Sequence, residues 1–163
     1  MLYFLAFVVV ITAIIVFLHW YSYQSLKNSI VKRGSWDLDI CCGNVGAGKV
    51  NADIVKHSDV PNFVLIENIY RLPFEDGQFD TVLCSHTAEH VDYPRRFDRE
   101  LRRVGKDVVS VLPPIWDLAA ALNVWEHRWL FFTVRKVHFK LPRAIPLPFA
   151  RRLQARIGQR INA

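Results

Sequence analysis

The sequence predicts a small α/β domain with a mostly parallel sheet and a reduced set of helices, preceded by one N-terminal transmembrane helix. Three features support this prediction: an uncharged apolar run at the start, five short apolar segments after it, and a single clear amphipathic helix among those segments. The chain has 163 residues, a length that allows one domain. Hydrophobic residues make up 52% of the chain, and this content excludes a disordered protein.

Residues 1–21 are predicted to form a transmembrane anchor. Leu2–Trp20 contains no charged residue, and a helix of this length spans about 28 Å, close to the roughly 30 Å hydrocarbon core of a bilayer. A cleavable signal peptide begins with basic residues and ends at a small-residue cleavage site, and the run shows neither feature. Trp20, Tyr21 and Tyr23 then supply aromatic rings of the kind that favour the headgroup layer.

Residues 22–36 are predicted to form a juxtamembrane linker or an extension of the helix. Lys27, Lys32 and Arg33 lie here, before any acidic residue. Positively charged flanks remain on the cytoplasmic side of a membrane, so we expect a single-pass membrane protein whose C-terminal domain is cytoplasmic. The odd count of three cysteines fits a reducing compartment better than a disulfide scaffold.

Five apolar segments have the composition of strands that are buried on both faces of a parallel sheet. They are residues 38–42, 49–54, 63–67, 79–85 and 108–112. Between the last two, the sequence predicts a helix that Asp92 caps, with Pro94 in its first turn and Gly105 at its end. The apolar stripe of this helix is Phe97, Leu101 and Val104.

The last third of the chain is predicted to contain a helix over Ile115–Phe132 and a strand over Val137–Leu141, where apolar and polar residues alternate. Residues 142–163 form a basic amphipathic segment. Its apolar residues recur every four positions among four arginines; they are Phe149, Leu153, Ile157 and Ile161. Two arrangements are open for this segment: a helix that lies in the membrane interface, and a terminal helix that packs on the domain.

Charge is distributed unevenly along the chain. Residues 1–90 carry six Lys and Arg against nine Asp and Glu, whereas residues 91–163 carry fifteen against six. A basic tail on an anchored protein favours contact with anionic headgroups, at about 1 kcal/mol per residue near the surface. Membrane lipid is therefore the expected partner of this tail. Nucleic acid would attract the same charge, but the sequence contains no nucleic-acid-binding motif, so nucleic acid is not an expected partner.

Four segments between Asp37 and Pro114 together resemble the class I S-adenosylmethionine-dependent methyltransferases, in the order and spacing of that family. They are Leu38–Gly43 (the first strand and its loop), Val50–Ile54 (the second strand with its acid), Leu72–Asp80 (the approach to the fourth strand) and Ser85–His90 (the segment that leaves it). The resemblance implies a Rossmann-like fold for residues 37–141. It also implies methyl transfer from the cofactor S-adenosylmethionine to an acceptor, for which the anchor favours a membrane-associated molecule such as a lipid or a quinone.

By resemblance, the cofactor-binding residues lie near the ends of the first four strands. Gly43 lets the backbone approach the ligand, and Asp53 accepts hydrogen bonds from ribose hydroxyls, as acids do in dinucleotide sites. Alternatively, Asp53 is a plain surface acid at a strand end. The complete set is Asp39, Gly43 and Asn44 for the amino-acid tail, Asp53 for the ribose, Asn68 and Ile69 near the adenine, and Ser85 beside the cofactor.

His86 and His90 are the candidate catalytic residues, because a base is needed where the acceptor loses a proton. Glu89 and His90 could instead only brace the segment that follows them. His127 and His138 are isolated in the sequence and are expected to be structural or interfacial. No metal-ligand spacing is present, so the sequence predicts no metal site.

The sequence departs from the family pattern in ways that leave other functions open. Cys41 and Val45 stand where the family has glycines, and Asn68 stands where it has an acid. Only Asn44–Gly48 separates the first two strands, which is too short for a crossover helix. One sheet face would then be bare, so the anchor, the C-terminal segments or a protein partner must cover it. The alternative functions are a catalytically degenerate accessory or scaffold subunit of a membrane complex, and a membrane-surface binding module that uses the basic tail.

Overall fold

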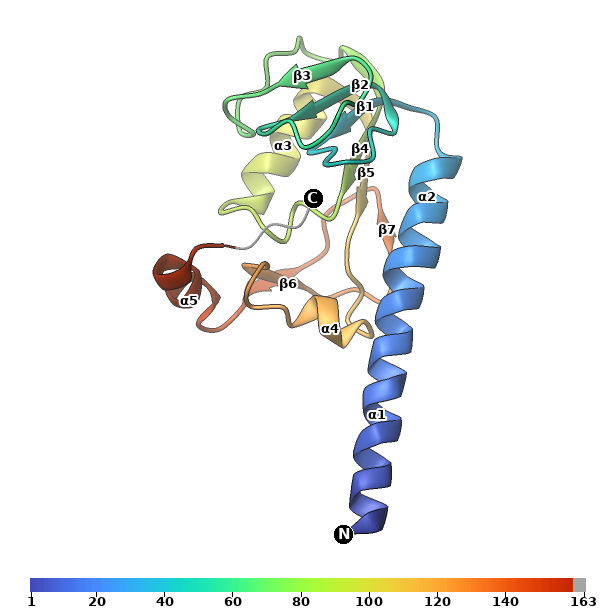
Figure 1. Ribbon diagram of the computed structural model, residues 1–163. Coiled ribbons are helices and arrows are strands. Elements are labelled where there is room, and N and C mark those ends of the chain that lie inside the picture. The colour runs from blue at the N-terminus through green and yellow to red at the C-terminus, as the bar shows by residue number, and fades with distance from the viewer. Residues whose placement is uncertain (160–163) are drawn as a thin grey trace.

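The computed structural model describes residues 1–159, in which a long N-terminal helix stands beside a six-stranded sheet (Figure 1). The expected α/β class with a mostly parallel sheet is confirmed. The elements in chain order are α1 (Leu2–Trp20), the π-helix η1 (Tyr21–Lys27), α2 (Asn28–Arg33), β1 (Trp36–Ile40), β2 (Gly48–Asp53), β3 (Phe63–Leu65), β4 (Phe79–Ser85), α3 (Pro94–Val104), β5 (Gly105–Val111), α4 (Leu118–Ala121), β6 (Trp129–Phe131), β7 (Val137–His138), β8 (Ala144–Pro146) and α5 (Ala150–Ile157).

The main sheet has the strand order β3-β2-β1-β4-β5-β7, and β6 pairs with β8 in a separate two-stranded sheet. Neighbouring strands from β3 to β5 are parallel, whereas β7 runs antiparallel to β5. Ile40 at the end of β1 is in register with Ala52 on one neighbour and Cys84 on the other. The carboxyl ends of β1, β2 and β4 therefore meet at one edge, the place where open α/β sheets bind ligands.

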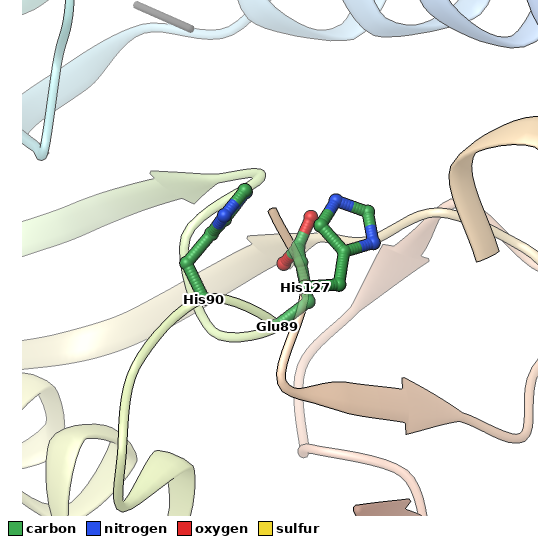
Figure 2. A group of neighbouring side chains, drawn as sticks. All are labelled: Glu89, His90 and His127. Carbon is green, nitrogen blue, oxygen red and sulfur yellow. The ribbon is translucent and has the colours of Figure 1, made fainter. Parts of the chain in front are cut away.

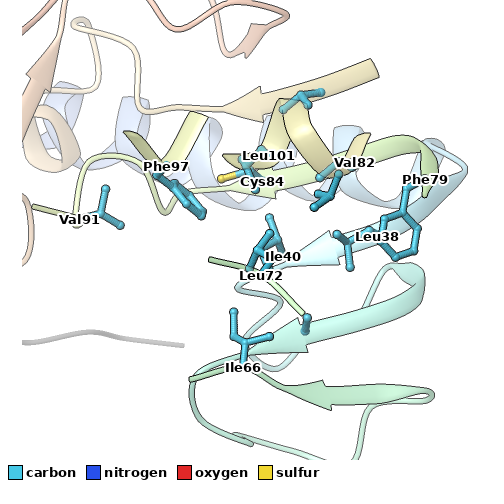
Figure 3. Close-up of a cluster of buried hydrophobic side chains, with 13 residues drawn as sticks. Leu38, Ile40, Ile66, Leu72, Phe79, Val82, Cys84, Val91, Phe97 and Leu101 are labelled. Carbon is cyan, nitrogen blue, oxygen red and sulfur yellow. The ribbon is translucent and has the colours of Figure 1, made fainter. Parts of the chain in front are cut away.

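Helix α3 covers one face of this sheet, as the sequence predicts. Pro94 occupies its first turn, where the missing N–H of proline has no intrahelical partner to lose. The predicted stripe of Phe97, Leu101 and Val104 is buried against side chains of β1 and β4 (Figure 3). Burying a large apolar side chain contributes about 1.5–3 kcal/mol, so this contact forms the main core of the domain.

The opposite face is covered by the N-terminal helix, which continues from Leu2 to Arg33 (Figure 1). Val31 is 5% exposed and packs with Leu83 of β4 and Val111 of β5. Residues 21–33 are thus a helical extension of the anchor segment, one of the two forms expected for them. The extension covers the face that the short connection between β1 and β2 leaves without a helix.

The same helix is also tied to the domain by two polar contacts nearer to its apolar end. The hydroxyl of Ser22 is buried and accepts a hydrogen bond from Lys136 Nζ at 2.7 Å. His19 Nδ1 lies 3.0 Å from Asp117 Oδ1. These contacts fix the helix along its length against the domain.

The apolar part of the helix, α1, has no buried residue. Within residues 1–159 it supplies the one helix that is long and apolar enough to cross a membrane, with a mean hydropathy of 2.7 over an 18-residue window. Apolar surface of this extent on a small domain marks a contact with a membrane or another protein.

The expected helix over Ile115–Phe132 is wrong, because only α4 is helical there. The Asp117 side chain accepts the N–H of Ala120 at 3.2 Å and starts a single short helix. The Asn123 side chain then accepts a nearby backbone N–H, a local bond that competes with helix formation. The main chain beyond it bonds to the Glu89 carbonyl and enters β6.

Two further expectations at element ends differ from the structure. Tyr93 holds the N-cap position of α3, and the Asp92 carboxylate instead lies 2.7 Å from a guanidinium nitrogen of Arg128. The expected strand over Val137–Leu141 shortens to Val137–His138, since arginines of α3 bind backbone carbonyls that follow it.

Helix α5 packs on the domain through a face that the apolar pattern does not identify. Gln154 is buried, accepts a hydrogen bond from Arg128 and donates to two backbone carbonyls. Phe149 and Ile157 point to the surface and are 75% and 52% exposed. The expected apolar stripe extends to Ile161, which lies outside the described residues.

Replacing Val31 with Asp should detach the helical extension from the sheet. The new carboxylate would be buried without a partner against Leu83 and Val111, and we expect a loss of more than about 2 kcal/mol in the free energy of unfolding. Urea unfolding of the full-length chain in detergent measures this loss. The matched control is Lys32→Asp at the neighbouring exposed position, which should stay within about 0.5 kcal/mol of the wild type. Equal stability of the two variants would contradict the docking of the helix.

Candidate active site

A cavity of about 780 Å³ lies at the sheet edge where β1, β2 and β4 end. Its volume is within the range of roughly 300–1,000 Å³ that is typical of ligand pockets. Three parts of the chain form most of its wall: the loops after these strands, the helix between His19 and Val31, and the segment between Ala120 and Arg128. The cavity is therefore the candidate active site.

The loop after β1 is held in an uncommon backbone conformation. Cys41 and Gly43 have φ angles of 54° and 55°, in the left-handed region that glycine adopts without strain. Asp53 holds this loop, because its Oδ2 accepts the N–H of Gly43 at 3.0 Å and its Oδ1 accepts the N–H of Ile54 at 2.7 Å. Asp53 is 6% exposed and is not a plain surface acid. Its oxygens retain lone pairs for a ligand, since each carboxylate oxygen accepts more than one bond.

Asp39 gives the same end of the cavity a second buried carboxyl group. It is 3% exposed, and its Oδ2 accepts the N–H of Ala47 at 2.9 Å. Burial raises the pKa of Asp39 to about 6, and the charge of Asp53 adds to this rise. Two neighbouring acids in one buried site favour a ligand that carries a cationic group.

His86 follows β4 with a φ angle of 54°, which is uncommon for a residue with a side chain and concentrates at functional sites. Its Nδ1 lies 3.1 Å from Glu89 Oε1, and its ring meets the Tyr23 ring edge-on at a centroid distance of 5.6 Å. Burial lowers the pKa of His86 to about 4. The ring is therefore neutral at pH 7 and is a weak base.

Glu89, His90 and His127 form a compact group beside His86 (Figure 2). Glu89 is fully buried. The rings of His90 and His127 are nearly perpendicular, with centroids 4.7 Å apart. His90 Nδ1 lies 3.1 Å from the backbone oxygen of Glu126, and burial lowers the pKa of His127 to about 4. The group thus joins one carboxylate to two imidazoles at the wall of the cavity.

All but one of the sequence-predicted site residues line the cavity. The exception is Asn68, whose side-chain oxygen accepts the N–H of Tyr70 at 2.9 Å, while Tyr70 itself lines the cavity. The predicted residues that line the cavity are Asp39, Gly43, Asn44, Asp53, Ile69, Ser85, His86 and His90.

Sequence reasoning misses the contribution of the N-terminal helix to the site. His19, Tyr23, Lys27 and Val31 all line the cavity. They recur every four residues and so share one helix face, and this spacing at the end of an apolar run is the signal that could have identified them. His127 is missed because it lies far along the chain from the groups that it meets.

Comparisons with known proteins find similarity over part of the chain. Residues 35–109 match a family model described as a methyltransferase domain. An uncharacterized protein of Methanocaldococcus jannaschii is 34% identical over 67 residues, which are 39% of this chain and 29% of that protein.

Solved structures with a similar fold include a SAM-dependent methyltransferase from Aquifex aeolicus, at 18% identity and a TM-score of 0.41. The match covers 53% of this chain and 63% of that one. The YcgJ protein of Bacillus subtilis is similar at 21% identity and a TM-score of 0.45, over 68% of this chain and 61% of that one. The chain covers less than two thirds of each of these three proteins.

Proposed function

We propose, from the match of residues 35–109 to a methyltransferase-domain model and from the resemblance to the class I S-adenosylmethionine-dependent enzymes, that the chain transfers a methyl group from S-adenosylmethionine to a membrane-associated acceptor. The observation that carries the proposal is the cavity. One end holds the buried acids Asp39 and Asp53, and the other is walled by His19 and Tyr23, where the apolar helix α1 ends.

The residues at the strand ends fit the cofactor. The Asp39 carboxylate suits the ammonium group of the amino-acid tail, and Asp53 retains lone pairs that suit ribose hydroxyls. Gly43 has no side chain to block the close approach of the tail. When bound, the cofactor supplies an electrophilic methyl group on a sulfonium sulfur.

For catalysis, the acceptor end of the cavity must hold the acceptor in the correct position and orientation. His86 and Tyr23 narrow it with their rings, and holding the acceptor in line with the methyl group provides much of the rate enhancement. His90 is the better placed base. The Glu126 carbonyl beside its Nδ1 can only accept a hydrogen bond, so Nδ1 carries the hydrogen, and Nε2 is free to take a proton from the acceptor.

The N-terminal helix supports a membrane-associated acceptor. As a span, Leu2–Trp20 extends about 28 Å, so His19 lies at the level where the helix leaves a hydrocarbon core of roughly 30 Å. Helix α4 lies beside α1 at this level (Figure 1). Its neighbouring apolar side chains Leu118 and Leu122 are 47% and 54% exposed, as expected for residues that contact the headgroup layer. A lipid or a quinone would reach the cavity from this side.

The second candidate function is a catalytically degenerate accessory subunit. The short connection between β1 and β2 and the cysteine at position 41 favour it, because both depart from the family's cofactor loop. Binding of S-adenosylmethionine separates the two candidates, since the degenerate domain would not bind it.

Asp53→Ala should weaken the binding of S-adenosylmethionine by about 1–3 kcal/mol, because a charge-assisted hydrogen-bond partner of the ribose is lost. Calorimetry of the full-length chain in nanodiscs measures the affinity. The control is Asp59→Ala, which removes an exposed carboxylate that does not line the cavity and should leave the affinity unchanged. If the wild type binds the cofactor and Asp53→Ala binds it equally well, the ribose assignment is wrong.

The affinity for S-adenosylmethionine should fall as the pH drops below about 6. The Asp39 carboxylate takes up a proton in that range because of its raised pKa, and a neutral carboxyl group attracts the ammonium group of the tail less strongly. We expect a constant affinity above pH 6 and a decrease of up to about tenfold per pH unit below it. Calorimetry between about pH 5 and 8 follows the change. In Asp39→Asn the affinity should be lower throughout and independent of pH over this range; an unaltered pH profile would refute the role of Asp39.

The full-length protein should remain in membranes during alkaline carbonate extraction, with its C-terminal domain protected from protease outside intact cells. The matched control is a variant with Val10→Lys and Ile11→Lys, which places two charges at the centre of α1 at a cost of roughly 2.5–3.5 kcal/mol each. This variant should be extracted. Extraction of the wild type, or cleavage of its C-terminal domain from outside, would contradict the proposed span and its orientation.

A further inference from the structure

The arrangement of Glu89, His90 and His127 suits a function of the site other than methyl transfer. One possible ligand atom from each residue lies within 4.8 Å of the other two (Figure 2). The three atoms come from two separate segments of the chain: the one that leaves β4 and the one that leads into β6. Sequence spacing does not predict this arrangement, because the fold alone brings the segments together.

Within residues 1–159, three buried atoms of this group make no hydrogen bond of normal geometry. Among the described residues, neither oxygen of Glu89 makes a hydrogen bond of normal geometry, although Oε1 lies 3.1 Å from His86 Nδ1. His127 Nδ1 is likewise buried and has no partner within residues 1–159. A buried carboxylate with only one imidazole beside it is still costly, so a cation or bound water that satisfies these atoms would stabilise the arrangement.

Within residues 1–159, no direct contact supplies that cation. Lys136 attracts Glu89 electrostatically, but its ammonium group is held by the Ser22 hydroxyl at 2.7 Å. In the described part of the chain, no ammonium or guanidinium group pairs with Glu89.

Each imidazole of the group is held by the backbone through one nitrogen and leaves the other nitrogen available. His90 Nδ1 faces the Glu126 carbonyl at 3.1 Å, so the lone pair is on Nε2. The His127 ring hydrogen-bonds the Ala120 backbone, and its lone pair is on Nδ1. Metal-binding histidines show this arrangement, in which a carbonyl fixes the tautomer and aims the other nitrogen at the metal.

We propose that Glu89, His90 and His127 bind one divalent first-row transition-metal ion at the wall of the cavity, and that His90 Nε2 is then a metal ligand and not the base for the acceptor. Two imidazole nitrogens and one carboxylate form a ligand set that suits zinc, iron or manganese better than calcium or magnesium, which prefer oxygen ligands alone. Ligands at about 2.1 Å from a metal lie about 3.4 Å apart in a tetrahedral site, so the rings and the carboxylate need to close by roughly 1 Å. His90 and His127 line the cavity, so the remaining coordination positions of the ion would face its contents.

The test uses Co²⁺ as a spectroscopic probe on the full-length chain in detergent, purified without a polyhistidine tag and stripped of metal with a chelator. We expect one Co²⁺ per chain with visible absorption bands, and competition by Zn²⁺. His127→Gln should weaken Co²⁺ binding at least 100-fold, and Glu89→Gln should do the same. The matched control is His138→Gln, whose ring bonds to Thr133 and to the Arg135 carbonyl outside this group, and which should bind Co²⁺ like the wild type.

A second measurement keeps the test decisive where a variant is unstable. Metal should raise the thermal unfolding midpoint of the wild type and of His138→Gln, but not that of His127→Gln. The proposal is overturned if the folded wild type binds none of Co²⁺, Zn²⁺ and Mn²⁺, or if His127→Gln binds them as tightly as the wild type. Calorimetry with S-adenosylmethionine on the metal-free chain is scored separately, so failure of metal binding and failure of cofactor binding are distinguishable.

Discussion

The docking of one helix on one sheet face is the constraint on which the rest of the structure depends. The connection between β1 and β2 is too short to contain a crossover helix, so the sheet cannot cover this face from its own connections. Val31 supplies the cover by packing against Leu83 and Val111. Gly34 then leaves the helical conformation and leads the chain directly into β1. The first strand, the loop after it and the edge of the cavity therefore take their positions from this contact.

A buried polar pair holds the same helix at a cost in stability. Burial lowers the pKa of Lys136, which bonds to Ser22, to about 8. Below pH 8 the amine is charged in both the folded and the unfolded chain, and the cost of burying the charge is present in full. Between pH 8 and about 10.5 the folded chain releases the proton first, so this contribution to stability improves as the pH rises. We infer that the bond is retained because it fixes the position of the helix along the domain.

The parts of the fold that the sequence predicts are those that local patterns determine. In the sequence, strands that are buried on both faces are recognised as apolar runs. Helix α3 is recognised by its stripe of apolar residues and by the proline in its first turn. The helix predicted over Ile115–Phe132 is wrong because the aromatic residues there fit a helix locally, whereas β6 is determined by its pairing with β8. In the site, the acids at the strand ends follow from the family resemblance. His19 and Tyr23 do not, because an anchor is expected to span a membrane rather than to wall a cavity.

For the proposed methyl transfer, the N-terminal helix limits which acceptors can react, because the same helix is the proposed membrane span and a wall of the cavity. His19 and Val31 both line the cavity, and the helix between them rises about 18 Å. With α1 as a membrane span, the cavity wall therefore begins at the headgroup level and extends away from the bilayer. An acceptor that enters from the membrane must present its reactive atom outside the hydrocarbon core to approach the acids at the strand ends. A polar headgroup or a ring substituent at the end of an apolar chain meets this requirement, whereas an atom within an acyl chain does not.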